Sequence, residues 1–241
     1  RRPNMRFVPI KNVEQQAVLS VHRVRQGLIK ARTAQANQIR GLLSEFGLVL
    51  PVGISFLYQR VPILIDQAKD ELPGMFQELI WRLLEHLKDL DRQVNELERQ
   101  INVWHRSNKL SRKLEKVPGI GPITASALVA SIGDAKSFAN GRQLAAWLGL
   151  VPKQHSTGGK SNLLGISKRG DTYLRTLLIH GGRAIIRCAA LKPPQANSWL
   201  ARLLARRHKN VATVALANKN ARIVWALLAH DREFQVDYAG A

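Results

Sequence analysis

Apolar residues recur between residues 76 and 104 at spacings that alternate between four and three. This spacing puts one continuous apolar stripe on an α-helix and is typical of a helix that packs against another helix. Charged residues of both signs fill the positions between, which suits a solvated face. The pattern predicts a long coiled-coil helix whose stripe consists of Phe76, Ile80, Leu83, Leu87, Leu90, Val94, Leu97, Ile101 and Trp104.

The preceding segment repeats almost as regularly from about Asn12, and Gly47 is a suitable C-terminal stop. Two long helices joined by residues 47–73 favour an antiparallel helical hairpin, while a parallel pairing between two chains fits the same pattern. Either helix could also pack against its own copy, so we expect a homo-oligomer formed through the coiled coil. The stripe on the first helix is predicted to consist of Ala17, Val21, Val24, Leu28, Ala31, Gln35, Ile39, Leu42 and Phe46.

After residue 116 the sequence changes to short helical segments separated by Gly and Pro. The segment PGIGPITASALVASIG matches the helix-hairpin-helix pattern, in which a Gly-Ile-Gly turn exposes backbone N–H groups at a helix N-terminus, where they can bind phosphate. The residues assigned to this contact are Gly119, Ile120, Gly121 and Thr124. The alternative is a plain helical hairpin that uses Gly for close packing.

Further helices are expected at about 172–188, 197–207 and 211–229, whereas residues 151–170 are expected to form a basic, glycine-punctuated loop. The fold class is therefore mainly α, with a long helical coiled-coil hairpin over residues 12–116. A compact helical domain that contains the helix-hairpin-helix motif follows at residues 117–241.

The balance of charge favours a polyanionic partner. The chain carries 37 Lys and Arg against 17 Asp and Glu, a formal net charge of +20. Each phosphate that such a protein neutralises releases counterions, which makes association with nucleic acid strong and salt-dependent. An acidic protein or an anionic membrane surface is the alternative. No run of apolar residues is long enough for a transmembrane span, so we expect a cytoplasmic protein without a membrane partner.

Residues 152–160 place two hydroxyl groups, Ser156 and Thr157, beside a flexible Gly-Gly pair. A serine that attacks a phosphodiester needs cations to stabilise the charged transition state and a backbone that can bring its oxygen into line. The alternatives are a phosphate-binding loop and a simple connector. His155 could assist proton transfer. The cations expected to position phosphate are Lys153, Lys160, Lys168, Arg169 and Arg175.

The His and acidic residues show no spacing typical of metal ligands, so no metal site and no bound cofactor are predicted for this chain. Cys188 ends an apolar helical stripe and is expected to be buried.

The segment from Pro118 to Lys160, followed by GISKRGDTYLRTLLIHGGRA, resembles the C-terminal domain of bacterial insertion-sequence transposases of the DEDD type, and the resemblance extends upstream over essentially the whole chain. It implies a DNA recombinase guided by an element-encoded bridge RNA. It also implies a serine nucleophile within His155–Gly159, which we assign to Ser156. Many relatives carry serine immediately before the glycine, the position of Thr157 here, so Thr157 is the reserve candidate.

The resemblance further implies an N-terminal RNase-H-like domain whose four acidic residues hold Mg²⁺. That domain should precede Arg1, which would make residues 1–11 a linker from it. We therefore expect this chain alone to bind DNA or RNA and to cut poorly or not at all. Two functions stay open: a transposase that uses a serine nucleophile, and a non-catalytic nucleic-acid-binding module. A coiled-coil scaffold with incidental charge is a third.

Overall fold

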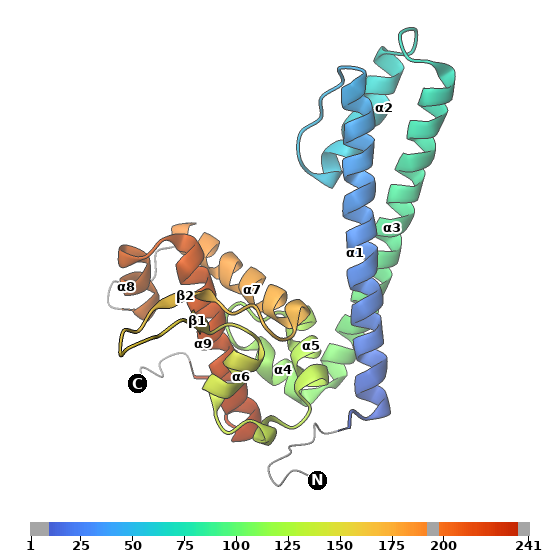
Figure 1. The fold of residues 1–241 in the computed structure, drawn as a ribbon. Helices are drawn as coiled ribbons and strands as arrows, with labels where there is room; N and C mark the ends of the chain where they lie inside the picture. The colour runs from blue at the N-terminus through green and yellow to red at the C-terminus, as the bar shows by residue number, and fades with distance from the viewer. Residues whose placement is uncertain (1–9, 192–197, 236–241) are drawn as a thin grey trace. The chain divides into compact units, whose positions relative to one another are not determined.

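The computed structural model describes residues 10–191 and 198–235, which are mainly helical as predicted (Figure 1). Residues 1–9 of the predicted linker, and residue 197 of a predicted helix, lie outside this part of the chain. The chain divides into two compact units, Ser20–Gln100 and a second one made of Arg1–Leu19 with Ile101–Ala241. The boundary thus falls at residue 100, ahead of the predicted position at residue 116. The elements of the first unit are α1 (Val13–Glu45, which begins in the second unit), α2 (Ile54–Gln67) and α3 (Gly74–Ser107, which ends there).

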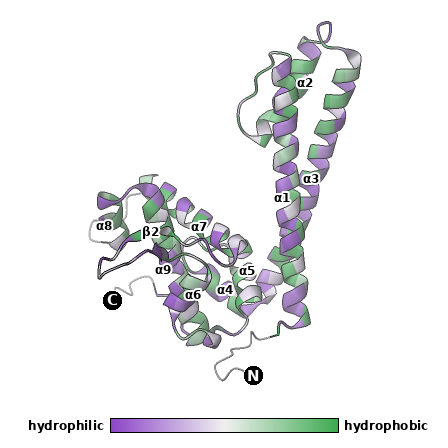
Figure 2. Cartoon of the chain, in the orientation of Figure 1, coloured by the Kyte–Doolittle hydropathy of each residue, from purple (hydrophilic) through white to green (hydrophobic). Residues whose placement is uncertain are grey.

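Helices α1 and α3 pack antiparallel within the first unit. The Nε of Arg25 donates a hydrogen bond to Glu98 Oε1 at 2.9 Å, Arg32 forms an ion pair with Asp91, and the side chains of Gln35 and His86 meet at 3.0 Å. The partner's number falls as the number on α1 rises, which defines an antiparallel hairpin and confirms that prediction. Figure 2 shows hydrophilic and hydrophobic residues alternating along both helices.

The predicted stripe on α3 is confirmed, because every one of its members is buried or half-buried. The predicted stripe on α1 is confirmed only in part. Gln35 and Ile39 are buried and Val21, Leu28 and Leu42 are half-buried, whereas Ala17, Val24, Ala31 and Phe46 are exposed. The residues that face α3 within this unit are also spaced by four and three, but three of them are polar. They are His22, Arg25, Ile29, Arg32, Ala36, Ile39 and Leu43.

Residues 47–73, predicted only as a connection, contain α2. This helix includes Pro62 and buries Leu57, Val61 and Ile65. Its buried face joins the core that α1 and α3 form at this end of the hairpin, where Ile39 and Leu84 are fully buried. Figure 1 shows α2 lying beside α1 and α3.

The second unit contains α5 (Pro122–Ile132), in which every residue from Thr124 to Ala130 is buried. Small side chains let the surrounding helices approach closely; at Gly182 a Cβ would lie 2.8 Å from the carbonyl oxygen of Thr213. The remaining elements of this unit are α4 (Lys109–Glu115), a 3₁₀ turn (Ala135–Ser137), α6 (Gly141–Trp147), β1 (Pro152–Gln154), β2 (Leu163–Ile166), α7 (Thr172–Leu191), α8 (Trp199–Arg206) and α9 (Lys209–Ala229). Helices α7, α8 and α9 correspond to the predicted helices at 172–188, 197–207 and 211–229.

Residue 188 lies on the solvent side of α7, so the prediction of a buried Cys188 is wrong. The buried positions of this helix are Leu174, Arg175, Leu178 and Gly182, and the helical period carries that face on to Ile185 and not to Cys188. None of the helices in the described residues is long and apolar enough to cross a membrane.

Candidate nucleic-acid interface

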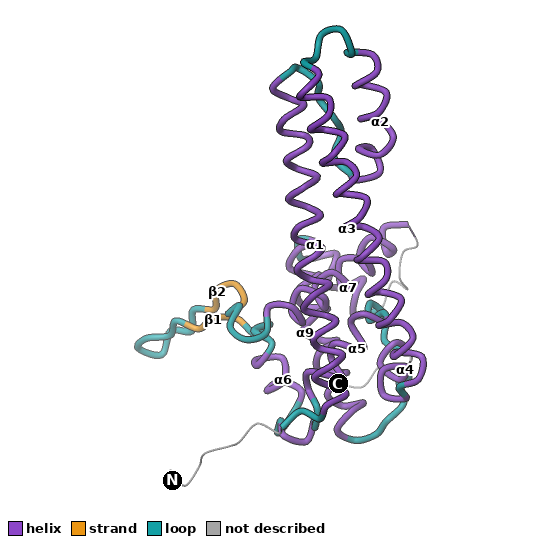
Figure 3. The backbone as a smooth tube through the Cα atoms, turned by 90° about the vertical axis from the view of Figure 1, so that its right-hand side faces the viewer, coloured by secondary structure: helices purple, strands orange, loops and turns teal. Residues whose placement is uncertain are grey.

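Residues 152–166, predicted as a loop, form a two-stranded antiparallel ribbon that we call the arm. Pro152 pairs with Ile166 and Gln154 with Leu163, with a bulge between the two pairs. At the tip, Lys160 N donates to Thr157 O at 3.1 Å, and Gly158 and Gly159 have φ angles of 56° and 76°. Positive φ at both central residues defines a type I′ turn, which favours Gly because other side chains are strained there. Figure 3 shows the arm extending away from α6 and α9.

Ser156 lies near this tip and is exposed. Its Oγ accepts a hydrogen bond of 2.9 Å from the side-chain amide of Gln154, which places both side chains on one face of the ribbon. Thr157, the reserve candidate, begins the turn and is also exposed. His155 lies between β1 and the turn and is exposed. Its assistance in proton transfer stays a prediction.

The base of the arm is held by close backbone contacts. A Cβ at Gly149 would lie 2.0 Å from Arg169 O, and a Cβ at Gly170 would lie 1.8 Å from Trp147 O. Arg175, a predicted phosphate contact, is only 7% exposed. Its guanidinium donates to Leu148 O at 3.0 Å, to Arg169 O at 3.3 Å and to Thr172 Oγ1 at 3.1 Å. The structure therefore gives Arg175 a positioning role at the base of the arm.

The other predicted cations of this region, Lys153, Lys160, Lys168 and Arg169, are all exposed. None of them forms a salt bridge with another residue in the described part of the chain. Residues 135–170 contain no Asp or Glu at all. The arm and its surroundings therefore present positive charge that no neighbouring carboxylate offsets along the sequence.

The Gly-Ile-Gly turn leads into α5. Its first glycine packs against α7, and its second glycine is exposed to solvent. Gly119 has φ 85°, and a Cβ there would lie 2.9 Å from the carbonyl oxygen of Gly181 on α7. Ile120 is buried, as expected of an anchor, and Thr124 is only 7% exposed. Gly121 is exposed and has open space where a Cβ would stand. Gly119 thus serves packing, and Gly121 is the residue of this turn that a ligand could approach.

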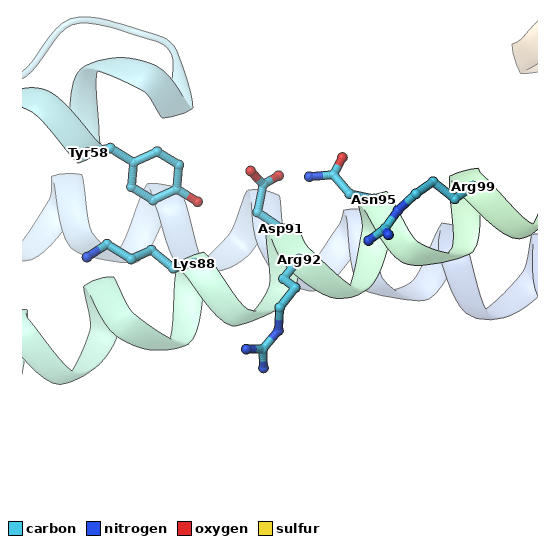
Figure 4. Close-up of a pocket in the computed structure, with 6 residues that line it drawn as sticks. All are labelled: Tyr58, Lys88, Asp91, Arg92, Asn95 and Arg99. Carbon is cyan, nitrogen blue, oxygen red and sulfur yellow. The ribbon is translucent and has the colours of Figure 1, made fainter.

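The net charge is concentrated in one of the two units. Residues 20–100 hold 11 Lys and Arg against 10 Asp and Glu, which leaves 26 basic and 7 acidic residues for the unit that carries the arm. The hairpin unit does contain a hollow of about 370 Å³ lined by Tyr58, Lys88, Asp91, Arg92, Asn95 and Arg99 (Figure 4).

The cations of this hollow are individually paired. Lys88 forms a salt bridge with Glu85, Arg92 with Asp89, and Arg99 with Glu96. Figure 4 also shows Arg92 pointing away from Tyr58 and Asp91, so the side chains do not converge on a common point. The arm is therefore the stronger candidate for an anion-binding site.

Within residues 10–191 and 198–235, no three His, Cys, Asp or Glu side chains are grouped so that they could hold a metal ion.

Sequence reasoning missed the ribbon and the two leucines on it, Leu163 and Leu164. The signal was present, since a Gly-Gly pair between two short segments is typical of a hairpin turn. The flanking segments lack the regular alternation of a half-buried strand because the arm buries neither face: its residues from Pro152 to Gly165 are all exposed.

Together, the basic helical unit and its exposed, lysine-bearing arm are features typical of proteins that bind nucleic acid. Residues 111–198 match the family model described as "Transposase IS116/IS110/IS902 family". The chain is 53% identical to a Pseudomonas aeruginosa protein named "Probable family 20 transposase", over 95% of this chain and 68% of that protein. It is 42% identical to the transposase for insertion sequence element IS1111A of Coxiella burnetii, over 97% of this chain and 64% of that one.

A third relative is the transposase for insertion sequence element IS1328 of Yersinia enterocolitica, which is 39% identical over 97% of this chain and 69% of its own length. The chain belongs to the IS116/IS110/IS902 family of transposases. It spans roughly two thirds of the length of these relatives.

Proposed function

We propose that this chain binds DNA through its basic unit and, as part of an insertion-sequence transposase, cleaves and exchanges DNA strands with Ser156 as the nucleophile. The observation that carries the proposal is the placement of Ser156 near the tip of an exposed arm within a region free of acidic residues. The family membership supports the class of reaction. Thr157 remains the reserve nucleophile.

In the proposed step, the Oγ of Ser156 forms a bond to phosphorus while the bond from phosphorus to one sugar oxygen breaks. The serine loses its proton, and the leaving oxygen gains one. The exposed ammonium groups of Lys153 and Lys160 stabilise the charge that develops on the phosphoryl oxygens. Gly121 and its neighbours at the start of α5, the proposed helix-hairpin-helix contact, bind a more distant phosphate through backbone N–H groups.

The full reaction, as we propose it, also needs partners. A four-acid domain of the DEDD type that binds Mg²⁺ would act beside the serine, and on its own this chain would bind nucleic acid without efficient cleavage. A bridge RNA is the proposed guide, and the concentrated positive charge suits RNA as well as DNA. Apolar residues left uncovered on α1, Val24 among them, support self-association of the coiled coil in a cytoplasmic homo-oligomer.

The test is a search for a covalent protein–DNA adduct. The chain is incubated with junction DNA of its element, Mg²⁺ and guide RNA, with and without an added acid-bearing domain, and the products are separated on denaturing gels. We expect an adduct that Ser156→Ala abolishes and Thr157→Ala retains. The reverse pattern would move the nucleophile to Thr157. Salt-sensitive binding without any adduct would support the non-catalytic binding module instead.

A further inference from the structure

The arm carries two large apolar side chains in water. Leu163 is 62% exposed and Leu164 is 49% exposed, although both belong to β2. A two-stranded ribbon that buries neither face is only marginally stable by itself, and exposed leucines add to that cost. Leucines in such a position indicate a surface that is covered when the arm binds its partner.

The two leucines differ in their relation to Ser156. Leu163 is the cross-strand partner of Gln154, and directly paired residues share one face of a ribbon. Gln154 in turn donates its hydrogen bond to Ser156 Oγ. Leu163, Gln154 and Ser156 therefore lie on the same face, while Leu164, the next residue along the strand, points to the other.

We propose that Leu163 packs against a nucleobase next to the phosphodiester that Ser156 attacks, and that it partly unstacks this base and so sets the position of the strand. This inference rests on the proposed function, since it takes Ser156 as the attacking group. Leucine is among the apolar residues that proteins insert between base steps, where it displaces water from the base faces.

Charge identifies the occupant as nucleic acid. The arm that bears Leu163 also carries Lys153 and Lys160, and Lys168 and Arg169 lie at its base; all four cations are exposed. A strand with phosphates on its outside and apolar base faces inside matches an arm that combines cations with an exposed leucine. A two-stranded ribbon also has the dimensions to enter a groove of a duplex.

The experiment uses the full chain and duplexes of the element's junction that carry 2-aminopurine at successive positions, one position per duplex. Fluorescence of this base rises when it is unstacked. We expect the unsubstituted chain to raise the fluorescence at one or two adjacent positions, and Leu163→Ala to abolish the rise. We also expect Leu163→Ala to weaken binding about fivefold to tenfold, because one leucine is no longer buried on binding.

Leu164→Ala is the matched control: it removes an equally large exposed side chain from the other face and should keep the fluorescence rise. Lys160→Ala should reduce the salt dependence of binding and leave the rise in place at saturating protein. Both leucines are exposed, so neither substitution disturbs the core.

The outcomes separate the two proposals. Salt-sensitive binding with the same fluorescence rise in Leu163→Ala and in the unsubstituted chain would overturn the role of Leu163 alone. Absence of salt-sensitive binding by the unsubstituted chain would overturn the proposed function, and this inference with it.

Discussion

At the scale of single residues, the protonation of His22 is coupled to the folding of the hairpin. His22 is 1% exposed on the face of α1 that meets α3. Burial, together with the positive charge of Arg25, lowers its pKa from 6.5 to about 4. An unfolded chain therefore binds a proton at His22 below pH 6.5 that the folded hairpin does not bind, and stability falls as the pH falls.

We predict that the free energy of unfolding of the hairpin decreases by at most about 1.4 kcal/mol per pH unit from this group as the pH is lowered from 6.5 toward about 4. Denaturant titrations across this range measure the effect, and His22→Gln removes the titrating group. The difference between the two proteins should grow in favour of the variant as the pH falls. Parallel curves for both proteins would show that His22 does not contribute.

Arg175 stabilises the base of the arm through hydrogen bonds to the residues around it. Its guanidinium has three acceptors within the fold, two of them carbonyl oxygens at the base of the arm. Arg175→Met should destabilise the unit by about 1.5–3 kcal/mol, because carbonyl groups lose charge-assisted partners. Arg175→Lys, which cannot reach all three acceptors, should restore only part of this. A variant of full stability whose only defect is a lower salt dependence of DNA binding would instead indicate direct phosphate contact.

At the scale of secondary-structure elements, the contact between the Gly-Ile-Gly turn and α7 decides how the second unit packs. A Cβ at Gly181 would lie 1.8 Å from the carbonyl oxygen of Gly119, so α7 or the turn would have to shift. We predict that Gly181→Ala destabilises the unit by about 3 kcal/mol or more. Thermal unfolding followed by circular dichroism measures the loss.

Gly121→Ala is the control for this prediction. Gly121 has φ −91° and open space around its Cα, so alanine should be accommodated without loss of stability. The same variant reports on the proposed phosphate contact, because a methyl group there would keep a phosphate from the backbone N–H groups. Equal melting temperatures for Gly181→Ala and Gly121→Ala would contradict the packing derived from the structure.

How far the sequence predicts these elements depends on what fills each interface. On α3 the interface is apolar, and the heptad pattern identified it correctly. On α1 the same interface holds His22, Arg25 and Arg32, and the two arginines form ion pairs with Glu98 and Asp91 across the hairpin. Apolarity alone could not indicate these polar positions, so the predicted stripe was only partly right.

The candidate site shows the same limit. The sequence indicated Ser156 and its cations by residue type, and the structure places them on or beside one arm. The sequence could not indicate that Arg175 is buried or that Leu163 shares a face with Ser156, because both facts follow from contacts between residues that are separated along the chain. Local patterns carry no information on such pairs.

At the scale of the whole molecule, the two units differ in charge, and this difference predicts where nucleic acid binds. The unit with the arm holds 26 basic and 7 acidic residues, whereas residues 20–100 are nearly neutral with 11 and 10. In the hairpin, Arg25 and Arg32 also form ion pairs with the half-buried carboxylates of Glu98 and Asp91. Phosphate contacts should therefore come from the unit with the arm.

Lys160 and Lys30 provide a matched pair for this prediction, since both are exposed lysines and they lie in different units. The dissociation constant for a junction duplex is measured over a series of salt concentrations for the unsubstituted chain, Lys160→Ala and Lys30→Ala. Each lost phosphate contact reduces the slope of log K against log salt by about 0.9. We expect that reduction for Lys160→Ala and an unchanged slope for Lys30→Ala. Equal reductions in both variants would mean that DNA also contacts the hairpin unit. The near-zero net charge of that unit would then not predict where the phosphates bind, because individual unpaired lysines would decide it.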